Sequence, residues 1–403
     1  MLAPEEQLHI IRSGAAQIVP EDALLKKLQR GVPLNIKLGV DPTAPDIHLG
    51  HAVPLRKLRQ FQDLGHEVTL IIGDGTAMIG DPSGRNSTRP QLSRQQIDEN
   101  AQTYVDQAFK VLDPSKTTLR YNSEWILGLD MEGLLKLLSN FTVARILERD
   151  DFHNRYTSGQ PISLHEFLYP VMQAYDSVVI KADVELGGTD QLFNLLAGRE
   201  LMEKLGMEPQ VCLTLPLLEG TDGVRKMSKS YGDYIGLTDV PEDIFGKVMS
   251  IPDEIMVKYF RLASNLPVDE IDEIEQGLAN DVLHPNKVKR QLARNLVGLY
   301  YDEAAAAAAE EHFDKVFKAH EVPDDIPVFE GELTLNDDGQ VYLAALLHQA
   351  GLANSAGEAR RLIDGGGIKV NDVPVPAKQY NMDPADLKGA VIKAGKRKFL
   401  QIP

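Results

Sequence analysis

The feature that most restricts the fold of this 403-residue chain is an alternation of short apolar runs with longer helical patterns over its first 235 residues. The apolar runs, which predict buried strands, are residues 34–39, 67–73, 183–187 and 210–215. The helical patterns are residues 50–64, 92–112, 163–181 and 190–205. This alternation predicts an α/β fold with a doubly wound, Rossmann-like parallel sheet and helices on both faces. Ligands of such sheets bind beyond the carboxyl ends of strands, so functional residues are expected directly after strands.

The rest of the chain predicts further domains. We expect residues 1–235 to form the sheet domain and residues 236–320, which lose the strand signal, to form a helical domain. The run of alanines at 304–309 is a helix former without chemistry of its own. Residues 321–339, with their prolines and many acidic residues, predict a linker. Residues 340–403 then predict a small α+β module.

The charge distribution suggests a nucleic-acid partner. The whole chain carries a formal charge of −17. Residues 340–403 contain nine Lys or Arg and five Asp or Glu, a net charge of +4, which leaves −21 for the rest. A basic module on an acidic body is typical of proteins that bind nucleic acid, although chance would also explain a small excess.

The cysteine content and the apolar segments predict the compartment. Cys212 is the one cysteine, which excludes an intrachain disulfide and a Cys-rich zinc site and fits a reducing environment. The first ten residues are acidic where a signal peptide is basic, and the chain holds no run of 18 apolar residues. We therefore expect a soluble, cytoplasmic protein without a membrane partner.

Residues 39–51, GVDPTAPDIHLGH, run from a predicted strand into a predicted helix. A helix start offers free backbone N–H groups and the positive end of the helix dipole, which suit phosphate. His48 and His51 bracket Gly50, whose missing side chain lets a flat base or a ribose approach the backbone. Two histidines at this spacing are also compatible with a metal pair or with ordinary surface residues.

A second candidate segment is KMSKS, residues 226–230, which follows DGVR. Lys226 and Lys229 can both reach one polyphosphate from a glycine-flanked loop. Ammonium groups on flexible stems suit a phosphate whose shape changes during reaction. A solvated basic loop has the same composition, and a bare K-x-x-K pattern is more often that.

The two segments lie 178 residues apart, from His48 to Lys226, on one predicted scaffold. Together, HLGH and KMSKS resemble the two signatures of class I aminoacyl-tRNA synthetases. GDGTAMIGDPSGR (73–85), YPVMQAYD (169–176) and GGTDQ (187–191) resemble the tyrosyl members, most closely their bacterial branch. The resemblance covers nearly the whole chain. It implies a ligase that activates tyrosine with ATP to tyrosyl-adenylate plus pyrophosphate, and then transfers tyrosine to the 3′-terminal adenosine of tRNA(Tyr).

One predicted helix face carries residues suited to a tyrosine substrate. Tyr169, Gln173 and Asp176 follow the i, i+4, i+7 spacing and share a face, although a polar face in solvent has the same spacing. By the resemblance, Tyr169, Gln173 and Asp81 hold the substrate ammonium, and Gln191 lies near its carboxylate. Asp176 would accept the hydrogen bond of the tyrosine hydroxyl. Phenylalanine would leave that buried acceptor unpaired.

The resemblance also implies an ATP site. Gly188 and Asp190 contact the ribose, whose hydroxyls a carboxylate can accept from. The spacing in GDGTAMIG is not that of a dinucleotide fingerprint. The implied catalytic residues, which grip the phosphates and close over the pyrophosphate as a mobile lid, are Thr43, His48, His51, Lys226 and Lys229. The other implied ATP ligands are Gly39, Asp41, Gly50 and Met227.

The C-terminal module resembles a small RNA-binding domain first known from a ribosomal small-subunit protein. In residues 351–375, Ser355 is expected to cap a helix that ends at glycines 365–367, with a strand after it. RNA helices are read largely by shape and backbone, so a basic face suffices for binding. The residues implied to face RNA are Arg360, Arg361, Lys369, Lys396, Arg397 and Lys398. A solvated charged helix would carry the same residues.

Three positions depart from the family pattern. Leu49 replaces isoleucine in the first signature, and we expect little change. Lys37 stands where the other bacterial branch has a tyrosine that contacts the substrate hydroxyl, so we assign Lys37 to the tyrosine site, where it donates to the phenol oxygen or points elsewhere. Gly75 stands where a larger side chain is usual and would widen the pocket or loosen the turn.

The implied mechanism needs no covalent bond to the protein. The tyrosine carboxylate attacks the ATP α-phosphorus in line, and positioning and charge stabilisation accelerate the step. A ribose hydroxyl of the terminal tRNA adenosine then attacks the adenylate. Mg²⁺ is expected with ATP, and neither a permanently bound cofactor nor a resident metal is expected. The resemblance also implies a homodimer with its contact around residues 125–165.

Three other functions remain compatible with parts of the sequence. A tryptophanyl enzyme shares the fold, but it lacks the C-terminal module and would give Asp176 no phenol to meet. A non-catalytic RNA-binding relative should have decayed signatures, and both are intact. A nucleotidyltransferase acting on a small molecule would not need the basic module.

Overall fold

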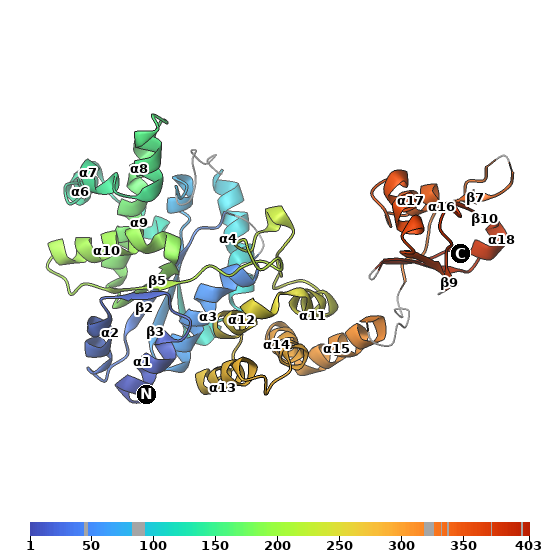
Figure 1. The fold of residues 1–403 in the computed structure, drawn as a ribbon. Coiled ribbons are helices and arrows are strands. Elements are labelled where there is room, and N and C mark those ends of the chain that lie inside the picture. The colour runs from blue at the N-terminus through green and yellow to red at the C-terminus, as the bar shows by residue number, and fades with distance from the viewer. Residues whose placement is uncertain are drawn as a thin grey trace. The chain divides into compact units, whose positions relative to one another are not determined.

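The computed structural model describes residues 1–403 except 44–46, 83–92, 318–325, 332, 337, 372 and 396–397, and it does not describe the side chains of Ser230 and Phe317. The chain divides into two compact units, Met1–Ala306 and Ala307–Pro403 (Figure 1). No helix within the described ranges combines the length and the apolar character that a membrane crossing needs.

The first unit is built on a six-stranded sheet with the order β1-β6-β5-β2-β3-β4. Neighbouring strands from β6 to β4 are parallel, and β1 pairs antiparallel with β6. The strands are β1 (Gln17–Val19), β2 (Asn35–Val40), β3 (Glu67–Ile72), β4 (Thr117–Tyr121), β5 (Val184–Gly188) and β6 (Val211–Leu215). The predicted parallel sheet is therefore confirmed, and its four predicted strands are β2, β3, β5 and β6.

The sequence did not predict β1 and β4, and both are edge strands. The three residues of β1 are exposed or half-buried. In β4, TTLRY, no residue is fully buried. Edge strands of this kind lack the apolar run that marks a strand covered on both faces. The central strands do show it, since all five residues of β6 are buried.

The predicted helices of this unit are α3 (Leu49–Asp63), α4 (Arg94–Ala108), α9 (Leu168–Ile180) and α10 (Leu192–Lys204). Helices α9 and α10 pack side by side (Figure 1). The crossover from β2 to β3 through α3 and the crossover from β5 to β6 through α10 run in opposite directions along the sheet. Because such crossovers are right-handed, α3 and α10 cover opposite faces. The shorter helices of the unit are α1 (Pro4–Arg12), α2 (Glu21–Leu28), α5 (Ser123–Ile126), α6 (Met131–Leu138), α7 (Val143–Ile146) and α8 (Asp150–Thr157).

In the described residues, the region predicted to be helical contains five α-helices, a short 3₁₀ helix at Asp253–Ile255 and no strand. The α-helices are α11 (Pro241–Ser250), α12 (Met256–Ala263), α13 (Val268–Ala279), α14 (Pro285–Tyr300) and α15 (Glu303–Phe317). The alanine run lies in α15. Helix α12 packs on α3, and this region belongs to the same compact unit as the sheet up to Ala306, whereas the remainder of α15 is assigned to the second unit.

The second unit contains an antiparallel sheet with the order β12-β11-β8-β9. Its elements are β7 (Val341–Tyr342), α16 (Leu343–Gln349), α17 (Ala356–Asp364), β8 (Ile368–Val370), β9 (Val373–Pro374), β10 (Asn381–Met382), α18 (Pro384–Leu387), β11 (Val391–Ala394) and β12 (Lys398–Gln401). As predicted, Ser355 caps α17, and its Oγ accepts from the Glu358 N–H over 3.1 Å. The predicted linker falls partly outside the described residues. Phe329 within it is buried in the core of this unit.

Candidate active site

A cavity of about 280 Å³ opens at the carboxyl ends of β2, β3 and β5. The strand order reverses between β2 and β5, so the cavity lies at the switch point where ligands bind in such sheets. The predicted site residues that line it are Gly39, Asp41, Thr43, His51, Asp81, Tyr169, Gln173, Asp176, Asp190 and Gln191. The fold therefore brings five of the six predicted tyrosine ligands and four of the nine predicted ATP ligands to one cavity.

Asp41 organises one wall of this cavity. One oxygen of its carboxylate accepts from Tyr169 Oη over 3.0 Å, and the other accepts from Thr76 Oγ1 over 2.8 Å. A Cβ on Gly73 would lie 2.1 Å from Asp41 Oδ1, so this wall needs a glycine there. Burial, and then the charges of Asp41 and Asp81, raise the pKa of Tyr169 well above its ordinary value. Tyr169 therefore stays a neutral phenol.

Asp176 forms an almost fully buried part of the cavity wall. Its Oδ1 accepts from Trp125 Nε1 over 2.8 Å, and its Oδ2 accepts from Asn122 Nδ2 over 3.3 Å. Burial raises the pKa of Asp176 to about 6, although Lys37 and these two donors oppose the shift. Above that pH the group is a carboxylate with lone pairs left for a ligand hydroxyl.

Gly75 contacts Asn122 and helps to position its side chain beside the cavity. Its N–H donates to Asn122 Oδ1 over 2.8 Å. A Cβ on Gly75 would lie 3.0 Å from that oxygen and 3.4 Å from Ile126 Cδ1. Because Gly75 has no side chain, the Asn122 side chain fits beside it and donates to Asp176. Asn122 fills this space, so Gly75 does not widen the cavity.

Asp81 is held on the opposite side by Arg149. Its Oδ1 accepts from Arg149 Nη2 over 3.1 Å, and its Oδ2 accepts from Gln191 Nε2 over 2.9 Å. Arg149 is buried, pairs with Asp151 over 2.7 Å and donates to Asn194 Oδ1 over 3.0 Å. The carboxylate proposed for a substrate ammonium is therefore oriented before any ligand arrives.

Lys37, predicted as a tyrosine ligand, is not among the residues that line the cavity. It is fully buried, and its Nζ donates to Glu185 Oε1 over 2.8 Å, to Ser177 Oγ over 2.9 Å and to the Gln173 carbonyl over 3.2 Å. These three acceptors use all three hydrogens of the ammonium group. The structure thus favours the second of the two expected orientations, with Lys37 pointing away from a bound phenol.

The first signature forms the start of α3, with His48 as its N-cap residue. The rings of His48 and His51 stack with centroids 3.9 Å apart. The His48 backbone N–H donates to His51 Nδ1 over 3.5 Å, which leaves the imidazole proton of His51 on Nε2. A Cβ on Gly50 would lie 3.0 Å from His48 Cε1 and 3.6 Å from Met227 Cβ. Because Gly50 has no side chain, the HLGH segment can pack closely against Met227 of the KMSKS segment.

Both signature histidines are neutral at physiological pH. Burial first, and then His51, Lys229 and Lys226, lower the pKa of His48 to about 3. Desolvation and the same two lysines lower the pKa of His51 to about 4. His48 Nδ1 is buried without a hydrogen-bond partner in the described part of the chain. Each ring can therefore donate one N–H to a ligand without carrying charge.

A second hollow of about 160 Å³ adjoins the cavity, and both are lined by Gly39, His51, Gly187 and Gln191. Gly50 and Gly188, both predicted for ATP, belong to its lining. Its apolar lining residues include Val53, Pro54, Leu215 and Leu217. A narrow hollow with glycine and aliphatic walls suits a flat aromatic ring.

The KMSKS segment lies next to the first signature. Met227 is buried close to Gly50, whereas Lys226 is exposed. Lys229 Nζ lies 5.6 Å from the centroid of the Tyr234 ring. Neither lysine belongs to the described lining of the cavity, but their charges depress the pKa of both signature histidines. The segment thus presents positive charge beside the mouth of the site.

The basic residues predicted to bind RNA are in part visible in the second unit. Arg360 and Arg361 are exposed on α17, and Lys369 on β8 is half-buried. Lys398 Nζ donates to the carbonyls of Gly351 and Leu352 over 3.1 and 3.2 Å. Lys396 and Arg397 lie outside the described residues.

Several residues around the cavity were missed from the sequence. They are Thr76, Asn122, Trp125, Arg149, Glu185 and Asn194. Asn122 follows β4 directly, so recognising that strand would have marked it as a candidate. Asn194 lies three residues after Gln191, within hydrogen-bond reach at the start of α10. No comparable pattern marked Arg149, the N-cap residue of α8, which holds the cavity residue Asp81.

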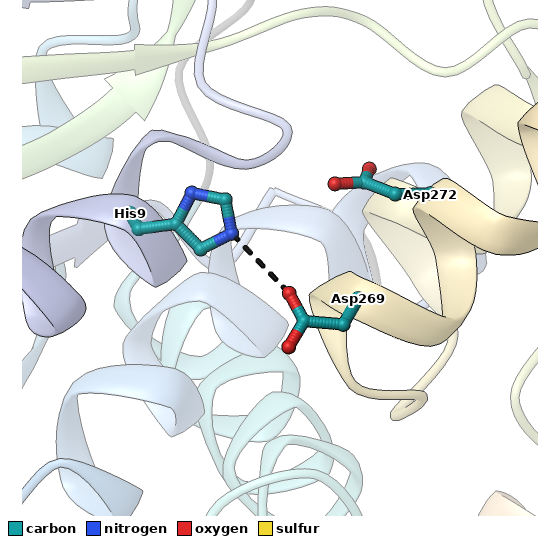
Figure 2. Close-up of side chains that lie close together, drawn as sticks. All are labelled: His9, Asp269 and Asp272. Atoms are coloured by element: carbon teal, nitrogen blue, oxygen red, sulfur yellow. Dashed lines mark ion pairs between the residues drawn. The ribbon is translucent and has the colours of Figure 1, made fainter.

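Away from the cavity, His9 on α1 lies near Asp269 and Asp272 on α13 (Figure 2). His9 Nε2 and Asp269 Oδ1 are 3.6 Å apart, with the Asp269 side chain 92% exposed. Asp272 already pairs with Arg261 over 2.7 Å. Exposed acidic groups of this kind are common without a metal, and we do not count the cluster as a metal centre.

Comparison with known proteins agrees with this geometry. Residues 29–318 match the family described as tRNA synthetases class I (W and Y), and residues 343–386 match the S4 domain. Two curated relatives named tyrosine–tRNA ligase come from Carboxydothermus hydrogenoformans and Thermotoga maritima. The first is 50% identical over 99% of this chain and 98% of its own length. The second is 49% identical over 100% of this chain and 98% of its own length.

Solved structures show the same fold. A tyrosyl-tRNA synthetase from Archaeoglobus fulgidus, complexed with L-tyrosine, is 25% identical and has a TM-score of 0.64, covering 76% of this chain and 99% of that one. A truncated mitochondrial tyrosyl-tRNA synthetase from Aspergillus nidulans is 23% identical and has a TM-score of 0.65, covering 79% of this chain and 95% of that one.

Proposed function

Because the chain belongs to the class I tRNA synthetases of the tryptophan and tyrosine type and is a tyrosine–tRNA ligase, we propose that the switch-point cavity is its tyrosine site and that the adjoining hollow receives the adenine of ATP. The observation that carries the proposal is Asp176, a buried carboxylate in the wall of a polar cavity, held by two donors and open to a third.

In this proposal the tyrosine ring points toward Asp176, which accepts the hydrogen bond of the hydroxyl. The substrate ammonium lies among Asp81, Tyr169 and Gln173, which line the same cavity. Gln191 lies beside Asp81 and turns toward the carboxylate end of the substrate. A phenylalanine substrate would leave the Asp176 carboxylate without this donor, at the cost of an unmet buried acceptor.

ATP would lie across the start of α3. Gly50 and Gly188 let the nucleoside approach the backbone, and Asp190 at the cavity rim accepts from its ribose hydroxyls. His48 and His51 donate neutral N–H groups to the phosphates, and Thr43 adds its hydroxyl. Gly39, Asp41 and Met227 complete the assigned ATP residues, with Asp41 acting through the orientation of Tyr169 and Met227 through its contact with the first signature. Mg²⁺ enters with the ATP phosphates as part of the substrate, and we assign it no protein ligand.

The two lysines of KMSKS then act on the transition state. We propose that Lys226 and Lys229 close over the leaving pyrophosphate while the tyrosine carboxylate attacks the α-phosphorus. Negative charge shifts onto the pyrophosphate as the bond breaks, so two nearby ammonium groups stabilise the transition state more than the ground state. Neutral histidines fit this arrangement, because they add hydrogen bonds without repelling the lysines.

We propose that the second unit binds tRNA through its basic residues. Arg360 and Arg361 are exposed on one helix, and Lys369 and Lys398 lie on strands of the same sheet, so backbone phosphates are suitable partners. Lys396 and Arg397 remain part of the prediction. We retain residues 1–235, 236–320, 321–339 and 340–403 as the proposed catalytic domain, helical domain, linker and RNA-binding domain. Charging of tRNA accompanies translation, so we propose the cytoplasm as the compartment.

We also propose a homodimer formed through the predicted contact region. A hollow of about 550 Å³ in this region has almost entirely apolar walls, including Leu134, Phe141 and Ile146. The large apolar side chains exposed nearby are Leu127 (61%), Met131 (70%), Leu135 (60%), Val143 (63%) and Leu164 (84%). A grouped apolar patch of this kind is typical of a protein–protein interface.

The test is amino-acid-dependent exchange of pyrophosphate into ATP, with tyrosine, phenylalanine and tryptophan compared on the purified full chain. Exchange with tyrosine alone is expected. Exchange with tryptophan would refute the role of Asp176, and equal exchange with phenylalanine would refute a hydroxyl-sensing pocket. Charging of tRNA(Tyr) with and without Arg360→Ala and Arg361→Ala then tests the basic helix, while the exchange rate should stay unchanged.

A further inference from the structure

A hydrogen-bonded polar cluster is buried beside the tyrosine cavity, and in it only the Gln210 amide oxygen lacks a partner among the described residues. Lys37, Ser177, Glu185 and Gln210 are each at most 1% exposed. Glu185 Oε1 accepts from Lys37 Nζ over 2.8 Å and from Gln173 Nε2 over 3.1 Å. Glu185 Oε2 accepts from Ser177 Oγ over 3.0 Å and from Gln210 Nε2. Burying an ion pair is costly and rarely stabilises a fold more than apolar residues would, so the cluster calls for another explanation.

Gln173 is the member of this network that lines the cavity. A glutamine amide can be turned either way, with its oxygen or its nitrogen toward the ligand. An ammonium ligand donates hydrogen bonds only, so it requires the amide oxygen. Which way Gln173 turns therefore decides whether this wall attracts or repels a substrate amino group.

Glu185 and Lys37 settle that orientation. An ammonium group has donors and no acceptor, so the Glu185 oxygen that faces Lys37 must accept. Gln173 Nε2 reaches the same oxygen and donates to it. The Gln173 amide oxygen is consequently turned the other way, where Asn194 Nδ2 donates to it over 2.8 Å. A reversed amide would place two donors against each other at Asn194 and two acceptors against each other at Glu185.

We propose that Glu185 and Lys37 are positioning residues that fix the amide orientation of Gln173 and thereby make the cavity selective for a substrate with a free α-amino group. The proposal rests on the assignment of Gln173, with Tyr169 and Asp81, to the substrate ammonium. It gives Lys37 a role in tyrosine recognition that acts through Gln173 and not through contact with the phenol.

The test replaces the ion pair by apolar residues of similar size, in the double variant Lys37→Met, Glu185→Met. Dissociation constants are measured for tyrosine and for 3-(4-hydroxyphenyl)propionate, which lacks only the amino group. Without Glu185, only the hydrogen bond from Asn194 Nδ2 holds the Gln173 amide, so its oxygen is no longer firmly oriented toward the ligand. Loss of one hydrogen bond to a charged group should raise the tyrosine constant about 10- to 100-fold and leave the constant of the analogue within about twofold.

A matched control is another buried ion pair of the unit, Arg155–Glu166, whose atoms are 2.6 Å apart and whose side chains are 2% and 3% exposed. Arg155→Met with Glu166→Met should leave both dissociation constants unchanged. The ratio of the two constants does not depend on the folded fraction, so partial misfolding cannot imitate the expected result. Glu185→Met alone provides a second variant, because it removes the acceptor of Gln173 Nε2 directly, and it should shift the ratio in the same direction.

Two results would overturn the inference. If the dissociation constants of tyrosine and of the analogue rise by the same factor, the ion pair only maintains the structure of the cavity. If neither constant changes, the ion pair does not orient Gln173. Gln173→Leu separates this failure from failure of the proposed site. If Gln173→Leu lowers the preference for tyrosine and the double variant does not, the site stands and the positioning role fails. If Gln173→Leu keeps the preference, the ammonium assignment itself fails.

Discussion

Replacing Asp176 by asparagine should make the ligand-free protein more stable at neutral pH while it weakens recognition of the tyrosine hydroxyl. Asp176 is almost fully buried, and burial raises its pKa from 3.8 to about 6. An asparagine of nearly the same shape cannot ionise. The substitution therefore removes the cost of a buried charge and also removes an acceptor-only group from the cavity.

The size of the stability change follows from proton linkage. The unfolded chain loses the Asp176 proton near pH 3.8, whereas the folded chain keeps it until about pH 6. Between these values the native state binds more protons, so stability falls as pH rises and stays lowered above pH 6. A shift of about 2 pKa units at 1.36 kcal/mol per unit gives about 3 kcal/mol. Loss of the hydrogen bond from Asn122 offsets about 1 kcal/mol.

Urea denaturation followed by far-ultraviolet circular dichroism, from pH 4 to 7.5 without tyrosine, measures the effect. Asp176→Asn should be about 2 kcal/mol more stable than the parent protein at pH 7.5 and slightly less stable at pH 4. In pyrophosphate exchange the same variant should lose much of its preference for tyrosine over phenylalanine, because an amide presents a donor as readily as an acceptor.

Asp74→Asn is a suitable contrast, since Asp74 is equally buried but pairs with Arg94 over 2.9 Å and accepts from the Ser123 N–H and hydroxyl. That variant should be less stable at neutral pH. If Asp176→Asn shows the same pH dependence of stability as the parent protein between pH 4 and 7, the argument from burial is refuted.

Four further outcomes are expected. Gly73→Ala should lower tyrosine affinity at least tenfold, because its Cβ would lie 2.1 Å from a carboxylate oxygen of the wall; near-normal affinity would mean that the wall adapts. Lys229→Ala should reduce the rate constant of exchange while the dissociation constant of tyrosine stays nearly constant, and equal loss of both would count against a transition-state role. The pH profile of exchange should show no limb that belongs to the signature histidines, because burial and the lysines keep both neutral; a limb that disappears in His51→Gln would contradict this. Leu164→Glu should convert a dimer into monomers in sedimentation experiments, and an unchanged mass would argue against the proposed interface.

The sequence alone determined the parallel sheet and much of the site. Strands covered on both faces are nearly continuous apolar runs, so β2, β3, β5 and β6 were visible in the sequence, even though Lys37 and Glu185 interrupt the runs of β2 and β5. Helix periodicity placed Tyr169, Gln173 and Asp176 on one face, and the structure shows all three in one cavity. Local patterns of this kind are fixed by residues close together in the chain, which is why they can be read without a structure.

What the tertiary structure decided is how side chains far apart in sequence are paired. Lys37 looked like a substrate ligand, but Glu185, 148 positions away, takes its ammonium group. Arg149 reaches Asp81 across 68 positions, and Asn122 reaches Asp176 across 54. No local pattern encodes such partners, because hydrogen bonds and ion pairs depend on distances between atoms that only the packed fold brings together.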